Sequence, residues 1–185
     1  MKMLLIYPRW PKLDRQTEFH LPPHGPVVFA ATLPASVDVT FIDENLQIID
    51  ENLQTIDFDA NCDVVALSTM LTAQLPRAFE IAAIFRKKGI KVIFGGISTM
   101  LHSEEVRQHA DSIFLGEAEG RMEAVIEDLQ AGRLKPVYDY MNNPPDINLI
   151  GTARREILDR PLYNYRGVQM LDLVHASRGC KFDCF

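Results

Sequence analysis

Two cysteines near the C-terminal end of the sequence, Cys180 and Cys184, have the clearest capacity for chemistry. Three residues separate them, and Arg178-Gly179 precedes them. Closely spaced cysteines in a short loop bring their thiolates to one iron–sulfur cluster, whose sulfurs accept backbone hydrogen bonds. Spacing alone leaves two interpretations open: the first ligands of a metal cluster, or two unrelated free thiols.

Composition excludes several function classes. The net charge of −6 and the pI of about 5.3 argue against a nucleic-acid interface, which needs a concentrated basic face. The apolar runs, such as Val64–Leu67, are far shorter than the roughly 20 residues of a membrane-spanning helix. Pro8 and Arg9 interrupt the apolar N-terminus before a signal-peptide core forms. Three cysteines do not make a disulfide framework, and Cys62 is typical of a small, partly buried hydrophobe, so we expect a reducing cytoplasm.

Strand-like and helix-like patterns alternate over residues 1–130. Short apolar runs predict strands at 3–7, 37–42, 63–68, 90–94 and 112–115. Helical spacing predicts helices at 25–33, at 73–88, from 103 onward and at 118–130, and one amphipathic helix over the duplicated segment 43–56. This alternation with short connections predicts an α/β fold: a doubly wound, five-stranded parallel sheet in the flavodoxin-like order 2-1-3-4-5.

The last third of the sequence has a different character. Residues 133–151 are rich in proline, asparagine and aspartate and predict a linker, whereas 168–175 alternates like a strand. We therefore divide the chain into a domain at 1–132, a linker at 133–151 and a separate segment at 152–185. We expect this last segment to have little core of its own, and either to be mobile or to pack on the surface of the domain.

The carboxyl ends of the predicted strands carry the candidate binding residues, because ligands of open parallel sheets bind at that edge. Paired glycines there let a ligand lie against bare backbone. When each residue is taken alone, an ordinary turn or helix cap explains it better than a binding role does. The candidates are Asp43, Ser68, Thr69, Gly95, Gly96, Gly116 and Glu117.

Other familiar sites are not supported. The sequence has neither a G-x-G-x-x-G after its first strand nor a G-x-x-x-x-G-K, the motifs of dinucleotide and P-loop sites. His20 and His24 lie close together but have no third ligand nearby, so we interpret them as solvated loop residues. His102, His109 and His175 are isolated and are assigned structural roles.

Together these motifs resemble radical S-adenosylmethionine enzymes that carry an N-terminal cobalamin-binding-type domain. That family has a Cys-x-x-x-Cys-x-x-Cys motif after Ser/Thr-Arg-Gly, and residues 177–184 match its first part. The sequence ends two residues before the position of the third cysteine. Pro22-Pro23-His24-Gly25 is similar to the start of the family's first helix. Asp43, Ser68-Thr69, Gly95-Gly96 and Gly116-Glu117-Ala118-Glu119 match its strand ends in order.

The resemblance implies cobalamin at these strand ends, held without a histidine ligand to cobalt because Asp-x-His-x-x-Gly is missing after the first strand. It implies that Cys180 and Cys184 are ligands of a 4Fe–4S cluster that binds S-adenosylmethionine in a longer parent protein. Residues 152–185 would then be the bridge, first strand and partial cluster loop of the radical domain, and the fragment alone would be inactive.

The parent enzyme would act on a small-molecule substrate, by methyl transfer or by oxidative cyclisation as in the tetrapyrrole cyclase branch. The alternative is a non-catalytic module that binds a corrinoid or a partner. A response-regulator-like domain is disfavoured, because the third strand ends in Ser68-Thr69 where a phosphoacceptor aspartate is needed. We expect Gly95→Val and Gly96→Val each to abolish corrin binding and to leave the fold largely intact.

Overall fold

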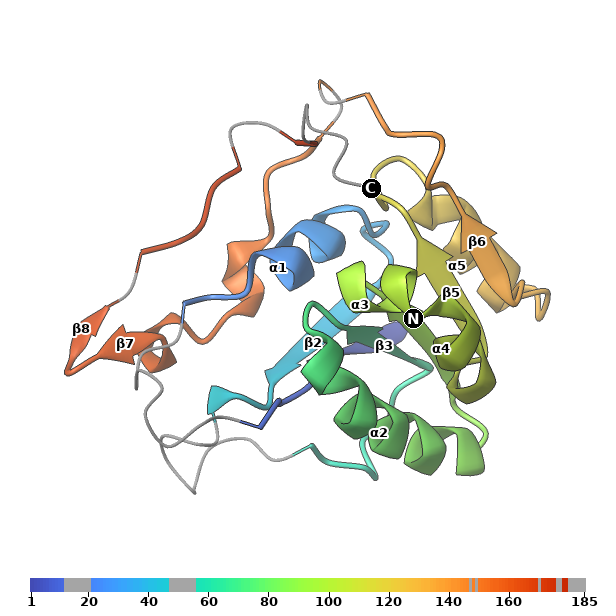
Figure 1. Cartoon of the computed structure of the whole chain (residues 1–185), viewed down its shortest axis with the longest axis horizontal. Helices are drawn as coiled ribbons and strands as arrows, with labels where there is room; N and C mark the ends of the chain where they lie inside the picture. The colour runs from blue at the N-terminus through green and yellow to red at the C-terminus, as the bar shows by residue number, and fades with distance from the viewer. Residues whose placement is uncertain are drawn as a thin grey trace.

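The computed structural model describes residues 1–11, 21–46, 56–146, 148, 150–169, 171–175 and 178–179. Its centre is a six-stranded sheet in the order β2-β1-β3-β4-β5-β6, with every neighbouring pair parallel (Figure 1). The predicted α/β fold and the order 2-1-3-4-5 are confirmed by the first five strands. The strands are β1 (Lys2–Tyr7), β2 (Asp38–Asp43), β3 (Val64–Ser68), β4 (Lys91–Gly95), β5 (Ser112–Leu115) and β6 (Val137–Asp139).

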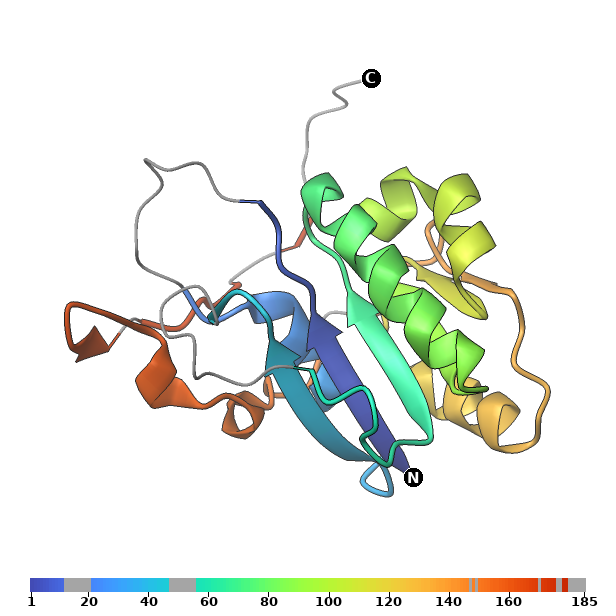
Figure 2. The ribbon, with the colours of Figure 1, turned by 90° about the horizontal axis from the view of Figure 1, so that it is seen from below.

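Helices cover both faces of the sheet, which is why the central strands are continuous apolar runs. Leu4 and Ile6 of β1 face α2 and α4, whereas Met3 and Leu5, which alternate with them, face α1 and α5. Figure 2 shows α2 lying across its face of the sheet. The α-helices are α1 (His24–Ala31), α2 (Leu75–Lys87), α3 (Ile97–Leu101), α4 (Ser103–His109) and α5 (Met122–Gln130).

The sheet has six strands where the sequence predicted five, because β6 forms within the segment interpreted as a linker. Tyr138 of β6 is buried and its ring stacks near Phe114 of β5 at 6.5 Å between centroids. In the main chain, Ile113 N donates a hydrogen bond to Pro136 O at 3.0 Å. Three residues between proline-rich and asparagine-rich stretches show no strand periodicity, so only the pairing with β5 identifies them.

Two further elements differ from expectation. Helix α5 begins at Met122 rather than residue 118, because Gly120 adopts a φ of 72° in the turn before it. The strand predicted at 168–175 is reduced to β8 (Val168–Gln169), which pairs antiparallel with β7 (Asn164–Tyr165) around Arg166-Gly167. Most of the duplicated segment predicted as an amphipathic helix lies outside the described residues.

The segment after residue 152 packs against the domain and does not stand apart from it. Leu158 and Tyr163 are buried with Val27 of α1 and Leu46 after β2. Arg154 N donates to Val27 O at 2.9 Å. This segment includes the 3₁₀ turns η4 (Arg155–Ile157) and η5 (Arg160–Leu162); a third turn, η2 (Thr72–Gln74), precedes α2. Among the described residues, no helix has the length and apolar character needed to cross a membrane.

Candidate functional site

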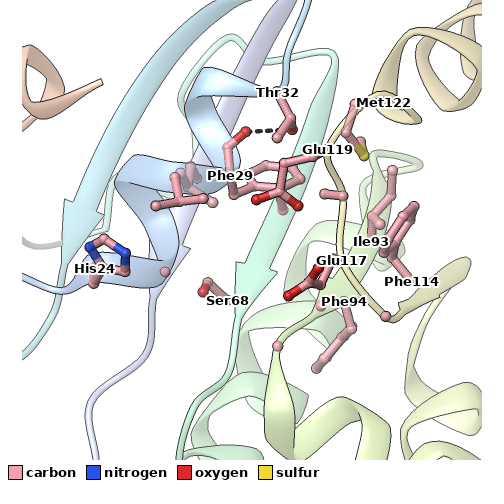
Figure 3. Close-up of a pocket in the computed structure, with 18 of the residues that line it drawn as sticks. His24, Phe29, Thr32, Ser68, Ile93, Phe94, Phe114, Glu117, Glu119 and Met122 are labelled. Atoms are coloured by element: carbon pink, nitrogen blue, oxygen red, sulfur yellow. Dashed lines mark hydrogen bonds between the residues drawn. The ribbon is translucent and has the colours of Figure 1, made fainter. Parts of the chain in front are cut away.

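A cavity of about 470 Å³ lies at the carboxyl edge of the sheet, between α1 and the loop after β5 (Figure 3). Helices α1 and α5 share this face of the sheet but leave the strand ends between them uncovered. The floor is therefore apolar, and the polar groups gather around it. The apolar lining includes Leu5, Phe29, Ala66, Ile93, Phe94, Phe114 and Met122; the polar lining includes His24, Ser68, Glu117, Glu119, His175 and Arg178.

The adjacent glycines Gly95 and Gly96 serve different purposes, although both line the cavity. A Cβ on Gly95 would meet no atom within 4 Å, so bare backbone faces open space there. A Cβ on Gly96 would lie 2.4 Å from Thr69 O, and the residue adopts a φ of 102°. Gly96 is thus required by the backbone itself, and the expectation that Gly96→Val leaves the fold intact is wrong.

Gly116 has the same structural requirement as Gly96. Its φ is 95°, and a Cβ would lie 2.8 Å from the carbonyl carbon of Tyr140. Gly116 and its neighbour Glu117 both line the cavity. The close approach of Tyr140, which follows β6, therefore fixes the loop that carries Glu117.

The hydroxyls predicted at the end of β3 separate into two environments. Ser68 lines the cavity, and its Oγ lies 3.7 Å from where a Cβ on Gly25 would be. Thr69 is fully buried outside the lining, and its Oγ1 shares a hydrogen bond with Thr99 Oγ1 at 2.9 Å. Thr69 thus ties the loop after β3 to α3, whereas Ser68 remains a candidate contact.

Asp43 ends β2 away from the cavity lining. Its Oδ1 accepts hydrogen bonds from Asn45 N and Nδ2, both at 2.9 Å, and its Oδ2 accepts from Tyr163 Oη at 3.2 Å. Burial and the Asp43 carboxylate together raise the pKa of Tyr163 far above its usual value. These contacts give Asp43 the role of attaching the C-terminal segment to the sheet.

A buried ion pair lies beside Asp43 and was not predicted. Glu44 is 1% exposed, and its carboxylate accepts from Arg77 Nη2 at 2.7 Å and from Arg9 N at 3.2 Å. The amide of Gln74 donates to Pro8 O at 2.6 Å. This network holds the main chain that leaves β1, so it fixes one boundary of the carboxyl edge.

Arg178 reaches two carboxylates of the cavity. Its Nη1 lies 2.5 Å from Glu119 Oε1 and 3.3 Å from Glu117 Oε1. The Glu119 side chain is only 6% exposed, whereas that of Glu117 is 39% exposed. The sequence placed both glutamates after the fifth strand and Arg178 just before the cysteines. No local pattern signals their contact.

His24 and His175 form a second contact between α1 and the C-terminal segment. Their ring centroids are 4.1 Å apart, although the sequence placed His24 in a solvated loop and left His175 isolated. Burial lowers the pKa of His24 most, and the neighbouring His175, Arg155 and Arg178 lower it further, against the Leu173 carbonyl, which raises it. These surroundings favour the neutral form of His24, which suits an apolar neighbour.

The predicted metal ligands Cys180 and Cys184 lie outside the described residues, as does His20. Within the described ranges, no group of three or more His, Cys, Asp or Glu side chains is arranged to hold a metal ion. The described site therefore has the character of a binding cavity with an apolar floor and a partly charged rim. It suits a small-molecule ligand with an apolar part for the floor and polar groups for the rim.

Comparison with known proteins places this geometry in context. The family described as B12 binding domain matches residues 13–126, more than half of the chain. The chain is 31% identical over 165 residues to bacteriochlorophyllide d C-8(2)-methyltransferase of Chlorobaculum tepidum, and 28% identical over 159 residues to the C-12(1)-methyltransferase of that organism. Each alignment covers 85% of this chain but 33% of the relative, so the chain spans about a third of their length. No solved structure matches the chain significantly.

Proposed function

The chain belongs to the B12-binding domain family, and from this premise we propose that it binds cobalamin at the carboxyl edge of its sheet. The nucleotide tail of the corrinoid occupies the cavity between α1 and the loop after β5. The aromatic base of the tail lies among Leu5, Ile93, Phe114 and Met122, whose burial against a flat ring is favourable. The cavity volume of about 470 Å³ falls within the range of small-molecule sites, about 300–1,000 Å³.

This proposal rests on one observation, the open space beside the backbone of Gly95. A Cβ there would enter the open cavity and not protein, so the backbone of β4 is bare on the side that a ligand would occupy. Ser68 stands on the neighbouring strand end and offers a hydroxyl to the same ligand. This bare backbone leaves room for a flat group to lie against the strand ends.

Exposed apolar side chains follow two of the strand ends that line the cavity, and they support the position of the corrin ring. Met70 follows β3, and Ile97 and Leu101 belong to α3 after β4; all three are exposed. Exposed apolar groups that gather at one edge of a sheet indicate a binding surface. In the proposed arrangement they support one face of the corrin ring, and the tail continues from the ring into the cavity.

We propose further that the whole protein is a radical S-adenosylmethionine methyltransferase. The names of both relatives favour methyl transfer over oxidative cyclisation, and they make tetrapyrrole pigments the first substrate class to test. When bound, cobalamin supplies a carrier for the methyl group. The motif at residues 177–184 supports Cys180 and Cys184 as ligands of a 4Fe–4S cluster.

Retention of hydroxocobalamin tests the binding proposal. The chain is mixed with excess hydroxocobalamin and desalted, and the corrin absorbance of the protein fraction is measured. We expect near-stoichiometric retention by the wild type, loss by Gly95→Val and retention by the control Gly151→Val, since exposed Gly151 lies outside this cavity and has open space around it. A colourless wild-type fraction would refute the proposal. Full retention by Gly95→Val would refute this position of the tail.

Iron incorporation tests the cluster proposal in the whole protein. After anaerobic reconstitution with iron and sulfide, Cys180→Ala and Cys184→Ala should each lose most of the bound iron and the broad cluster absorbance. Cys62→Ala is the matched control, because the Cys62 thiol packs beside the core formed with α2. Equal iron content in all variants would exclude the two C-terminal cysteines as ligands.

A further inference from the structure

We propose that Glu119 is a specificity residue that recognises the nucleotide tail: its buried carboxylate accepts a hydrogen bond from a ribose hydroxyl of the tail. This inference rests on the proposed binding of a corrinoid. It assigns a polar contact to a cavity whose floor is otherwise apolar. It also predicts that the chain distinguishes corrinoids that carry a nucleotide tail from those that lack one.

The first step is the state of the Glu119 carboxylate. Its side chain is 6% exposed, and Oε1 has no hydrogen-bond partner among the residues that the structure describes. The contact with Arg178 Nη1 at 2.5 Å is an ion pair without hydrogen-bond geometry. A buried acceptor that lacks a donor is costly, so a ligand that supplies a hydroxyl gains affinity by satisfying it.

The second step is the position of Glu119 in the cavity. Figure 3 shows its carboxylate directed toward Phe29 of α1, with Met122 of α5 and Phe114 of β5 farther along the wall. The apolar groups accommodate an aromatic base, and the ribose is the part of the tail bonded directly to that base. A polar side chain next to the apolar floor is therefore placed to meet the ribose.

The third step excludes the nearby protein hydroxyls as donors to Glu119. Thr32 has a hydroxyl on the same part of the wall, but its Oγ1 donates to Phe29 O at 2.7 Å (Figure 3). Ser68 lies farther along the cavity, toward Glu117. Neither hydroxyl is therefore available to Glu119, and the part of its carboxylate that Arg178 does not contact faces the cavity.

The competing explanation is that Glu119 only anchors Arg178 and, through it, the segment before the cysteines. Glu117 also contacts Arg178, at 3.3 Å, so the anchoring does not depend on Glu119 alone. The two roles predict different effects of removing Arg178. If Glu119 acts on the ligand, Arg178→Met leaves tail recognition in place; if it acts through Arg178, both substitutions have the same effect.

The test compares hydroxocobalamin with cobinamide, which lacks the nucleotide tail, by titration monitored with corrin absorbance. Glu119→Ala should weaken binding of hydroxocobalamin by about tenfold to a hundredfold, the range for a hydrogen bond to a charged group, and leave cobinamide unchanged. Glu123→Ala is the matched control, because Glu123 is exposed on the first turn of α5. Unchanged cobinamide affinity shows that Glu119→Ala is folded.

The remaining outcomes each decide the matter. Unchanged hydroxocobalamin affinity in Glu119→Ala, an equal loss for both corrinoids, or the same loss in Arg178→Met would overturn the inference. A wild type that binds both corrinoids equally well would also overturn it, with corrinoid binding intact. A wild type that binds neither refutes the proposed function itself. If Glu119→Ala does not fold, Glu119→Gln, which keeps the shape, should show a smaller loss confined to hydroxocobalamin.

Discussion

Replacing Gly96 with alanine puts a methyl group 2.4 Å from Thr69 O and 3.1 Å from Thr69 N. Thr69 is fully buried, and its hydroxyl is hydrogen-bonded to Thr99, so this backbone has little room to move. The conformation of Gly96, with φ 102° and ψ 174°, belongs to a region that is essentially restricted to glycine. Both effects act on the folded state, so we expect Gly96→Ala to destabilise the protein.

The magnitude follows from these two contributions. Backbone strain in this region costs about 1–3 kcal/mol, and overpacking against a rigid neighbour costs about as much again. We therefore expect the free energy of unfolding to fall by about 4 kcal/mol. For a chain of this size, that is a decrease in Tm of about 10 °C.

Gly95 is the matched comparison, since it is the adjacent residue and has open space around its Cβ position. Gly95→Ala should raise the free energy of unfolding by about 0.4–1 kcal/mol, because alanine restricts the unfolded chain without a clash in the folded one. Thermal unfolding followed by circular dichroism measures both variants. If the two variants change Tm equally, or if Gly96→Ala is as stable as the wild type, the separation of a structural from a ligand-facing glycine is wrong.

Two further predictions concern the contacts of the C-terminal segment. Tyr163→Phe removes the hydroxyl that donates to buried Asp43 Oδ2, so the free energy of unfolding in urea should fall by about 1–2 kcal/mol. A Tyr163→Phe variant as stable as the wild type would contradict the role given to Asp43. Folding lowers the pKa of His24, so near and below the ordinary histidine pKa of about 6.5 the unfolded chain binds more protons than the folded chain. The free energy of unfolding should therefore decrease as the pH falls from about 6.5 toward the folded-state pKa. His24→Gln should flatten the dependence of Tm on pH between 7.5 and 5; an unchanged slope would show that other groups cause it.

The strand ends illustrate how far the sequence predicts the site. Gly95, Glu117 and Ser68 were selected because ligands of parallel sheets bind at the carboxyl edge, and all three line the cavity. Asp43 and Thr69 were selected by the same rule but point into buried hydrogen bonds. Position along a strand specifies the edge, but the direction of each side chain there depends on loops from other parts of the chain.

The fold itself was readable from the sequence because parallel strands covered on both faces need continuous apolar runs, and short connections restrict their order. Strand β6 escaped prediction because three residues carry no period and become a strand only by pairing with β5. Only the tertiary structure could reveal the contacts of Glu119 with Arg178 and of Asp43 with Tyr163. Their partners are far apart in the chain, and no local pattern encodes such a distance. The sequence by itself thus determined the sheet and the edge that carries the cavity, whereas the packing of α1 and the C-terminal segment decided which residues line that cavity.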